Sequence, residues 1–248
     1  MKNNCDNSKY VISILGESIS TYSGYNPSGY AVYYDEEVQK VNGLRSVYDT
    51  WWAKVNQSLY AYLCVNNSYS GSMVSGMDFP AGHCHERLMR LHTSEHMPDL
   101  ILIYMGFNDF GYGVPIRCAP MSNEGQTNLL YFEDAYHQML TGLHYFYPHA
   151  RIICATLMRT TLQGNSMWAF PERLCGISLD EYNDAIRRAA VNCHVDLADL
   201  AKRHISFSDF FKRDMRYETL DGTHPTARGH QTIADEWIAC LSKIMDAH

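Results

Sequence analysis

The sequence predicts an α/β fold, a three-layer α/β/α sandwich built around a parallel five-stranded sheet. Three observations predict it. Short apolar runs of strand length alternate with longer segments of helical periodicity. The clearest run, at residues 98–106, is apolar throughout, as expected for a parallel strand covered on both faces. Small polar residues follow several strands at their C-terminal ends, where open α/β sheets bind their ligands.

Composition narrows the class of protein further. A chain of 248 residues, 46% of them hydrophobic, is long enough for one large core, and no linker or repeat divides it, so we expect a single domain over residues 1–248. The net charge of -7, with scattered Lys and Arg, argues against nucleic acid or an anionic membrane surface as a partner. No stretch resembles a signal peptide or an integral membrane segment. Eight cysteines without a Cys-x-x-Cys pair suit a reducing compartment, so the expected location is cytoplasmic.

The first predicted strand, residues 11–16, runs directly into Ser18. A Tyr-, Ser- and Gly-rich stretch at 19–48 has little periodicity and is expected to be a long loop. A helix is predicted over 51–63, because Trp and Leu recur there at helical spacing behind a capping threonine. The second strand is expected within 62–72, where an apolar run breaks into small polar residues.

The middle of the chain continues the alternation. A short helix is predicted at 85–91, followed by the strand at 98–106. The segment 127–146 carries an apolar helical stripe that Pro148 ends. A fourth strand is expected at 151–157.

An irregular stretch at 158–177 contains two large aromatic residues and is a candidate lid over the active edge. Ser178, with a glutamate three residues later, predicts the start of the next helix. A short fifth strand is expected at 193–197. The last helix opens at His224 and Pro225, since proline suits a first helical turn.

Polar residues cluster where three of the strands end and again before the last helix. The four clusters are Gly16–Ser18, Asn67–Gly71, Gly106–Asp109 and Asp221–Pro225. Their order along the chain resembles the SGNH hydrolases, the GDSL-type esterase/lipase superfamily, which has a flavodoxin-like fold.

The resemblance implies a role for each matching residue. Ser18 corresponds to the nucleophile, His224 to the general base and Asp221 to the acid that orients it. The backbone N–H groups of Ser18 and Gly71 and the side-chain amide of Asn108 correspond to the oxyanion hole. No cofactor and no metal is implied.

The same roles follow from general chemistry. A serine hydroxyl needs a base within hydrogen-bond reach, and a carboxylate must hold that base in one tautomer. Fixed N–H donors then stabilise the negative charge on the carbonyl oxygen. The sequence departs from the common family pattern at Glu17, where Asp usually precedes the serine, which leaves the local hydrogen bonding to be established.

Each motif also has a structural interpretation. Ser18 can cap a helix, Gly71 can serve a turn with positive φ, and Asn108 can form a cap or an Asx-turn. The tyrosines at 22–34 suit either the packing of a long loop or the binding of a sugar ring. His83, Cys84, His85, His92 and His96 are the candidates for a metal site, but no other ligand cluster has suitable spacing, so loop histidines are favoured.

The sequence therefore predicts a cofactor-independent serine esterase. Polar residues around the active edge favour a short acyl group, such as acetyl, on a carbohydrate or other polar substrate, whereas a long-chain lipase needs an extended apolar groove. The alternatives are a lysophospholipase or acyl-thioesterase on the same site, a catalytically silent carbohydrate-binding module, and a metal-dependent hydrolase.

Overall fold

The computed structural model describes residues 8–117, 127–158, 177–201 and 218–246. Its centre is a five-stranded sheet in the order β2-β1-β3-β4-β5, and every neighbouring pair is parallel. The strands are β1 (Tyr10–Gly16), β2 (Ala61–Ser68), β3 (Leu100–Tyr104), β4 (Arg151–Ala155) and β5 (Asp196–Ala198). The predicted parallel sheet of five strands is confirmed.

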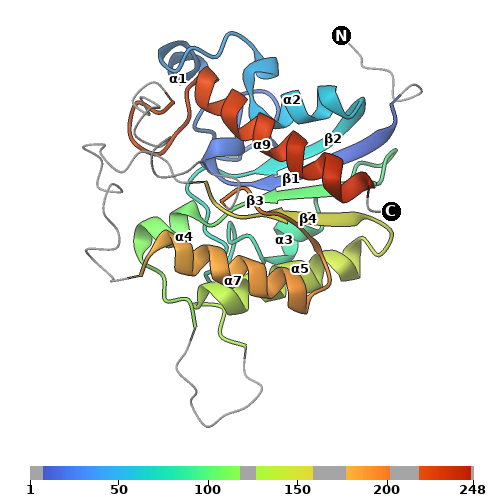
Figure 1. Ribbon diagram of the computed structural model, residues 1–248, viewed down its shortest axis with the longest axis vertical. Helices are drawn as coiled ribbons and strands as arrows, with labels where there is room; N and C mark the ends of the chain where they lie inside the picture. Colours follow the sequence, from blue (N-terminus) through green and yellow to red (C-terminus); the bar gives the residue numbers. More distant parts are fainter. Residues whose placement is uncertain (1–7, 118–126, 159–176, 202–217, 247–248) are drawn as a thin grey trace.

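Helices cover both faces of the sheet (Figure 1). Helices α2 and α9 pack together on one face, and α3, α5 and α7 lie on the other. The described helices are the 3-10 turns η2 (Ser18–Ser20) and η3 (Val47–Asp49) and the α-helices α1 (Glu36–Val41), α2 (Trp51–Ser58), α3 (His85–Leu88), α4 (Phe107–Tyr112), α5 (Phe132–Phe146), α7 (Leu179–Asn192) and α9 (Ala227–Asp246). The predicted three-layer sandwich is therefore present.

The central strands are apolar because both of their faces are covered. All five residues of β3 are buried, as are the last five of β1. Side chains that leave a parallel sheet on either face meet a helix layer, so neither face needs polar residues. The core thus fixes the C-terminal ends of β1 and β3 side by side, at the edge where their polar turns begin.

Several boundaries differ from the predicted ones. Helix α2 ends at Ser58 rather than at 63, because Tyr60 adopts a positive φ of 52° and the chain then enters β2 at Ala61. The stretch 19–48 is not all loop, since Asp35 caps the short helix α1. Most of the candidate lid at 158–177 lies outside the described residues.

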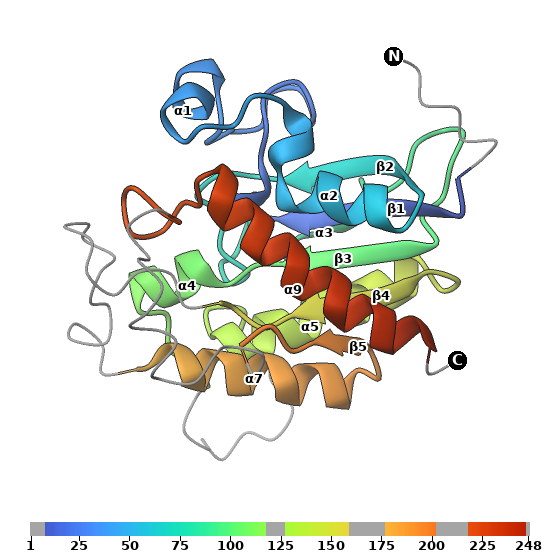
Figure 2. The same cartoon turned by 45° about the horizontal axis from the view of Figure 1, so that its top comes forward.

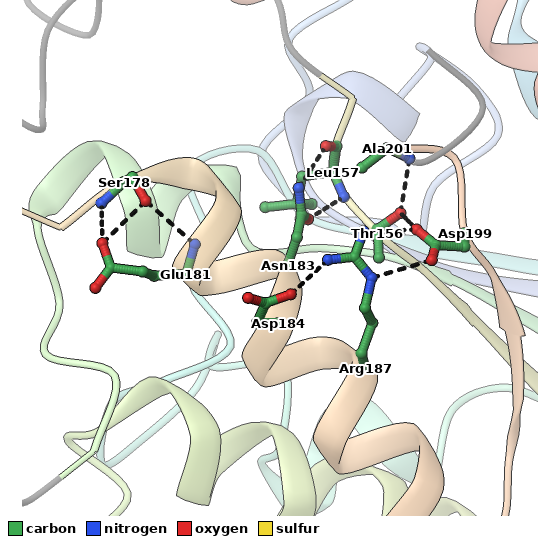
Figure 3. A network of polar contacts seen from close by, with 9 residues as sticks. All are labelled: Thr156, Leu157, Ser178, Glu181, Asn183, Asp184, Arg187, Asp199 and Ala201. Atoms are coloured by element: carbon green, nitrogen blue, oxygen red, sulfur yellow. Dashed lines mark hydrogen bonds and ion pairs between the residues drawn. The ribbon is translucent and has the colours of Figure 1, made fainter.

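Helix α7 is attached to the ends of β4 and β5 by polar contacts (Figure 3). The Asn183 side chain accepts a hydrogen bond from the Leu157 N–H at 2.7 Å and donates to the Leu157 carbonyl at 3.0 Å. Arg187 donates to both oxygens of Asp199, and Thr156 donates to the same carboxylate. Planar, two-point contacts of this kind fix orientation as well as distance.

The start of α7 confirms the predicted capping signal. The Ser178 side chain accepts from the Glu181 N–H, and the Glu181 carboxylate accepts from the Ser178 N–H at 2.7 Å. This reciprocal pair satisfies two backbone donors that the helix itself leaves free.

No helix in the described part of the chain is both long and apolar enough to span a bilayer.

Candidate active site

Ser18, His224 and Asp221 form a continuous hydrogen-bonded chain. The Ser18 Oγ lies 2.9 Å from the His224 Nε2, and the His224 Nδ1 lies 2.6 Å from the Asp221 Oδ2. With its proton on Nδ1, His224 donates to Asp221 and leaves Nε2 free to accept the serine proton. The fold therefore brings together three residues that span 206 positions of sequence.

The end of β1 positions the serine. The strand stops at Gly16, and the 3-10 turn η2 begins at Ser18. A Cβ on Gly16 would stand 2.7 Å from side-chain atoms of Ser20 and Ser68, so the turn is packed against its neighbours too closely for a larger residue. This close packing fixes the direction in which the Ser18 side chain points away from the edge of the sheet.

The loop before α9 positions the acid and the base. The Asp221 Oδ1 accepts hydrogen bonds from the backbone N–H groups of Thr223 and His224, at 2.9 and 2.7 Å. This Asx-type turn folds His224 back toward its own acid. Gly229 at the start of α9 allows the loop to pack closely against the helix, since a Cβ there would stand 2.3 Å from the Glu218 carbonyl oxygen.

The environment keeps Asp221 ionised. Burial alone raises its pKa, but the hydrogen bonds and charge of His224 and the N–H of Thr223 outweigh burial and hold the pKa well below its usual range. A carboxylate with a low pKa stays negative throughout the pH range in which an imidazole titrates. Asp221 can therefore stabilise the imidazolium that forms when His224 takes a proton.

A cavity of about 190 Å³ opens beside the Ser18–His224 pair. Its lining includes Gly71 and Asn108, so all the residues predicted for the oxyanion hole meet at one site. In the described part of the chain, the backbone N–H groups of Ser18 and Gly71 have no hydrogen-bond acceptor. Gly71 has a φ of +80°, a conformation that other residues rarely adopt. Two unengaged donors are thus available to a developing oxyanion.

Asn108 lies at the cavity with its side-chain amide already engaged. The Nδ2 donates to the Glu17 Oε2 at 2.7 Å and to the Ser72 carbonyl at 2.9 Å. Both hydrogens of the amide are used, so an oxyanion can receive this donor only if one of these bonds is shared or exchanged. Hydrogen bonds in a site without substrate often rearrange when the substrate binds. The role predicted for Asn108 stays a prediction.

Glu17 fixes the start of α4. It is fully buried, and its carboxylate accepts from the backbone N–H of Phe107 at 2.9 Å and of Asn108 at 3.2 Å. These bonds satisfy N–H groups that a helix start leaves without partners. The glutamate that departs from the family pattern therefore joins the serine turn to the asparagine turn.

Two further buried ionisable side chains beside the site were not predicted from the sequence. The Asp109 carboxylate accepts from the N–H groups of Val74 and Ser75 and from the Ser75 hydroxyl, and so holds the segment after Gly71. The Arg87 guanidinium donates to the Gly16 carbonyl at 2.9 Å, at the end of β1. Asp109 belongs to a motif that the sequence shows, but its hydrogen-bond partners are distant in sequence and could not be predicted. Arg87 lies in no motif that pointed to the site.

Glu17 gives the protein a specific pH dependence of stability. Burial, and then the charge of Asp109, raise the pKa of Glu17 from 4.5 to about 8, against the opposing hydrogen bonds from Phe107 and Asn108. Between these two values the folded protein holds a proton that the unfolded chain releases, so stability falls as the pH rises. We expect the Tm to fall between pH 5.5 and 8.5, and to fall less in Glu17→Gln.

Calorimetry at a series of pH values measures this difference. Glu86→Gln, which neutralises an exposed carboxylate on α3, is the control and should keep the wild-type slope. Equal slopes for Glu17→Gln and wild type would mean that Glu17 is ionised at both ends of the range. Burial raises the pKa of Asp109 to about 6. Asp109 therefore also makes the Tm fall with rising pH, at lower pH values, in all three proteins.

The histidines considered for a metal site have other contacts. The His83 Nε2 lies 2.7 Å from the Gly76 carbonyl, and the His92 Nδ1 lies 3.2 Å from the Tyr147 hydroxyl. Within residues 8–117, 127–158, 177–201 and 218–246, no three His, Cys, Asp or Glu side chains stand close enough together to hold a metal ion.

The tyrosine-rich loop serves both packing and the site. Tyr22 and Tyr34 are buried in the core, whereas Tyr25 is exposed. Tyr33 lines the cavity and lies face to face with the His224 ring. The predicted packing role is present for Tyr22 and Tyr34, and the binding of a sugar ring stays a prediction.

Comparison with known proteins agrees with this architecture. The model of the GDSL-like lipase/acylhydrolase family matches residues 10–174, more than half of the chain. No curated protein matches the chain significantly.

Solved structures share the fold over almost the whole chain. A protein from Bacteroides ovatus, assigned as a GDSL-like lipase, is 23% identical with a TM-score of 0.68, over 96% of this chain and 99% of its own. An acetyl-xylooligosaccharide esterase variant from Geobacillus is 16% identical with a TM-score of 0.60, over 96% of both chains. A carbohydrate acetylesterase from Sinorhizobium meliloti is 14% identical with a TM-score of 0.61, over 97% of this chain and 100% of its own.

At these identities the solved structures establish the fold, and the family match establishes the kind of chemistry. The chain belongs to the GDSL-like lipase/acylhydrolase family, within the SGNH hydrolase superfamily, and is a serine hydrolase that acts on ester bonds.

Proposed function

We propose that this protein removes acetyl or other short acyl groups from a carbohydrate or a similarly polar alcohol. The observation that carries the proposal is the cavity of about 190 Å³ beside the Ser18 hydroxyl. Pockets for drug-sized ligands typically have about 300–1,000 Å³. The smaller cavity suits a short acyl group better than a long chain.

The lining of the cavity supports a polar substrate. Phe107 and Phe110 contribute apolar surface to the lining, while Ser70 and Thr223 contribute hydroxyl-bearing side chains. Two of the similar solved structures are esterases of acetylated saccharides by their descriptions. The same substrate class is proposed here.

In the proposed mechanism, Ser18 attacks the carbonyl carbon of the ester while His224 Nε2 takes the hydroxyl proton. The carbonyl oxygen becomes negative and is stabilised by the N–H groups of Ser18 and Gly71, each such donor contributing about 3–4 kcal/mol. His224 then gives its proton to the leaving alcohol oxygen, and the acyl group stays on Ser18. Water, activated by His224, attacks the acyl-serine and releases the acid. Asp221 stays ionised through both halves of the reaction.

A series of p-nitrophenyl esters from acetyl to palmitoyl tests the acyl length. We expect kcat/KM to be highest for acetyl or propionyl and to fall at least tenfold by octanoyl, because longer chains do not fit beside Ser18. Acetate release from acetylated xylooligosaccharides then tests the alcohol part. A maximum at long chains would instead support a lysophospholipase or acyl-thioesterase, and saccharide binding without turnover would support a binding module.

A further inference from the structure

Tyr33 contacts both members of the acid–base pair. Its hydroxyl donates to the Asp221 Oδ2 at 3.0 Å, the same oxygen that accepts from the His224 Nδ1. Its ring lies parallel to the imidazole, with centroids 3.4 Å apart and planes 12° apart. Burial, and then the charge of Asp221, raise the pKa of the phenol above its usual value, so the hydroxyl keeps the proton that it donates.

The backbone around Tyr33 is attached to the serine turn. The Tyr33 N–H donates to the Thr21 Oγ1 at 2.9 Å, and that hydroxyl donates to the Ser18 carbonyl at 2.8 Å. The phenol therefore keeps a fixed position relative to the nucleophile, although it comes from the tyrosine-rich loop.

The next residue attaches the same loop to the histidine loop. The buried Tyr34 packs edge-on against the Tyr33 ring, with centroids 4.9 Å apart, and its hydroxyl donates to the Pro225 carbonyl at 2.8 Å. Tyr33 and Tyr34 thus bridge the two segments that carry Ser18 and His224. Side chains that are held from several directions in this way lose little freedom during the reaction.

We propose that Tyr33 is a positioning residue that holds the Asp221–His224 pair in register with Ser18 and moderates how strongly Asp221 stabilises the imidazolium. The proposal rests on the proposed function, because it concerns the same three residues. Tyr33 lies outside the four polar clusters that carry the resemblance to the family.

The two contacts of Tyr33 act on the imidazole in opposite directions. The ring face attracts the imidazolium more than the neutral imidazole, so stacking stabilises the charged form that His224 adopts when it takes the serine proton. The hydroxyl draws negative charge from the Asp221 carboxylate and so weakens the attraction of that carboxylate for the imidazolium. Removing the hydroxyl alone and removing the whole ring therefore have different expected effects.

Other charged groups near the pair are few in the described part of the chain. His230 on α9 is fully buried, and burial, and then the charges of Lys54 and His224, lower its pKa to about 3, so it stays neutral. Asp35 acts on Tyr33 from the start of α1. The side chains that interact with His224 in the described residues are Ser18, Tyr33, Asp221 and, through its charge, His230.

The test compares Tyr33→Phe with Tyr33→Leu. In each variant, kcat/KM for p-nitrophenyl acetate and the rate of labelling by a fluorophosphonate are measured from pH 5 to 9. The labelling rate measures the reactivity of Ser18 without any assumption about the natural substrate. In this reaction the Ser18 oxygen displaces fluoride at phosphorus while His224 takes the proton of the Ser18 hydroxyl. Circular dichroism shows whether each variant is folded.

In Tyr33→Phe we expect the acidic limb of both profiles to move up by about half a pH unit, with a three- to tenfold lower plateau. In Tyr33→Leu we expect the limb to lie below that of Tyr33→Phe and the plateau to fall by a further tenfold. Tyr25→Phe, an exposed position in the same loop, should match wild type in limb and plateau. The difference in limb position between Tyr33→Phe and Tyr33→Leu distinguishes this role from a merely structural one.

Superimposable profiles for wild type and folded Tyr33→Phe and Tyr33→Leu, with labelling at Ser18 intact, would overturn the role of Tyr33 and leave the esterase proposal standing. Loss of labelling and hydrolysis in wild type itself would overturn the esterase proposal, and the role of Tyr33 with it.

Discussion

Replacing Ser18 by alanine is expected to lower kcat for short-chain esters by about a million-fold, to the level that the remaining donors and binding contacts sustain. The hydroxyl oxygen is the atom that forms the covalent bond, and it lies 2.9 Å from the His224 Nε2. Tyr33, whose ring also contacts His224, is not expected to replace it, because its hydroxyl donates to Asp221. Initial rates with p-nitrophenyl acetate, at enzyme concentrations high enough to see residual turnover, measure the loss.

Ser23→Ala provides the matched control. Ser23 lies in the same loop, five residues later, and is exposed, so its loss should change kcat by less than twofold. Both variants should keep the Tm of wild type within a few degrees, since neither hydroxyl supports the core. If Ser18→Ala retained substantial activity, the nucleophile would be another residue and the acyl-serine mechanism would be wrong.

The fold could be predicted because its signals are local. The apolar run of β3 and the capping pair Ser178 and Glu181 are contained in a few residues, and each is present as predicted. Helices α1 and α4 were missed because six residues are too few for periodicity to appear. The position of a short helix depends on caps, and Glu17, which binds the start of α4, comes from a distant part of the chain.

The candidate site could likewise be predicted only where its residues belong to local sequence motifs. Ser18, Asp221 and His224 follow an ordered set of motifs, and the structure brings their side chains together. The contacts of Asn108 with Glu17 and Ser72 could not be predicted, since hydrogen-bond partners depend on the packing of separate segments. The stacking of Tyr33 on the imidazole is of this kind as well.

Asp221→Asn should leave the fold intact and lower kcat by about 10⁴-fold. The reason is specific to this loop. One carboxylate oxygen accepts from the backbone N–H groups of Thr223 and His224, so the amide of the variant must place its oxygen there and its NH₂ toward the imidazole. His224 then accepts at Nδ1 and carries its proton on Nε2, where it cannot take the proton of Ser18. Hydrolysis of p-nitrophenyl acetate should show the loss mainly in kcat.

Asp235→Asn is the matched control, because it removes the same charge from an exposed position on α9 and should retain wild-type activity. The alternative amide orientation would place the NH₂ group against two backbone N–H donors, and the repulsion between donors disfavours it. The variant therefore holds His224 in the tautomer that cannot accept the Ser18 proton. The same loss should appear in fluorophosphonate labelling of Ser18, since that reaction also needs His224 as a base. Near-normal activity and labelling in Asp221→Asn would mean that a different acid orients His224.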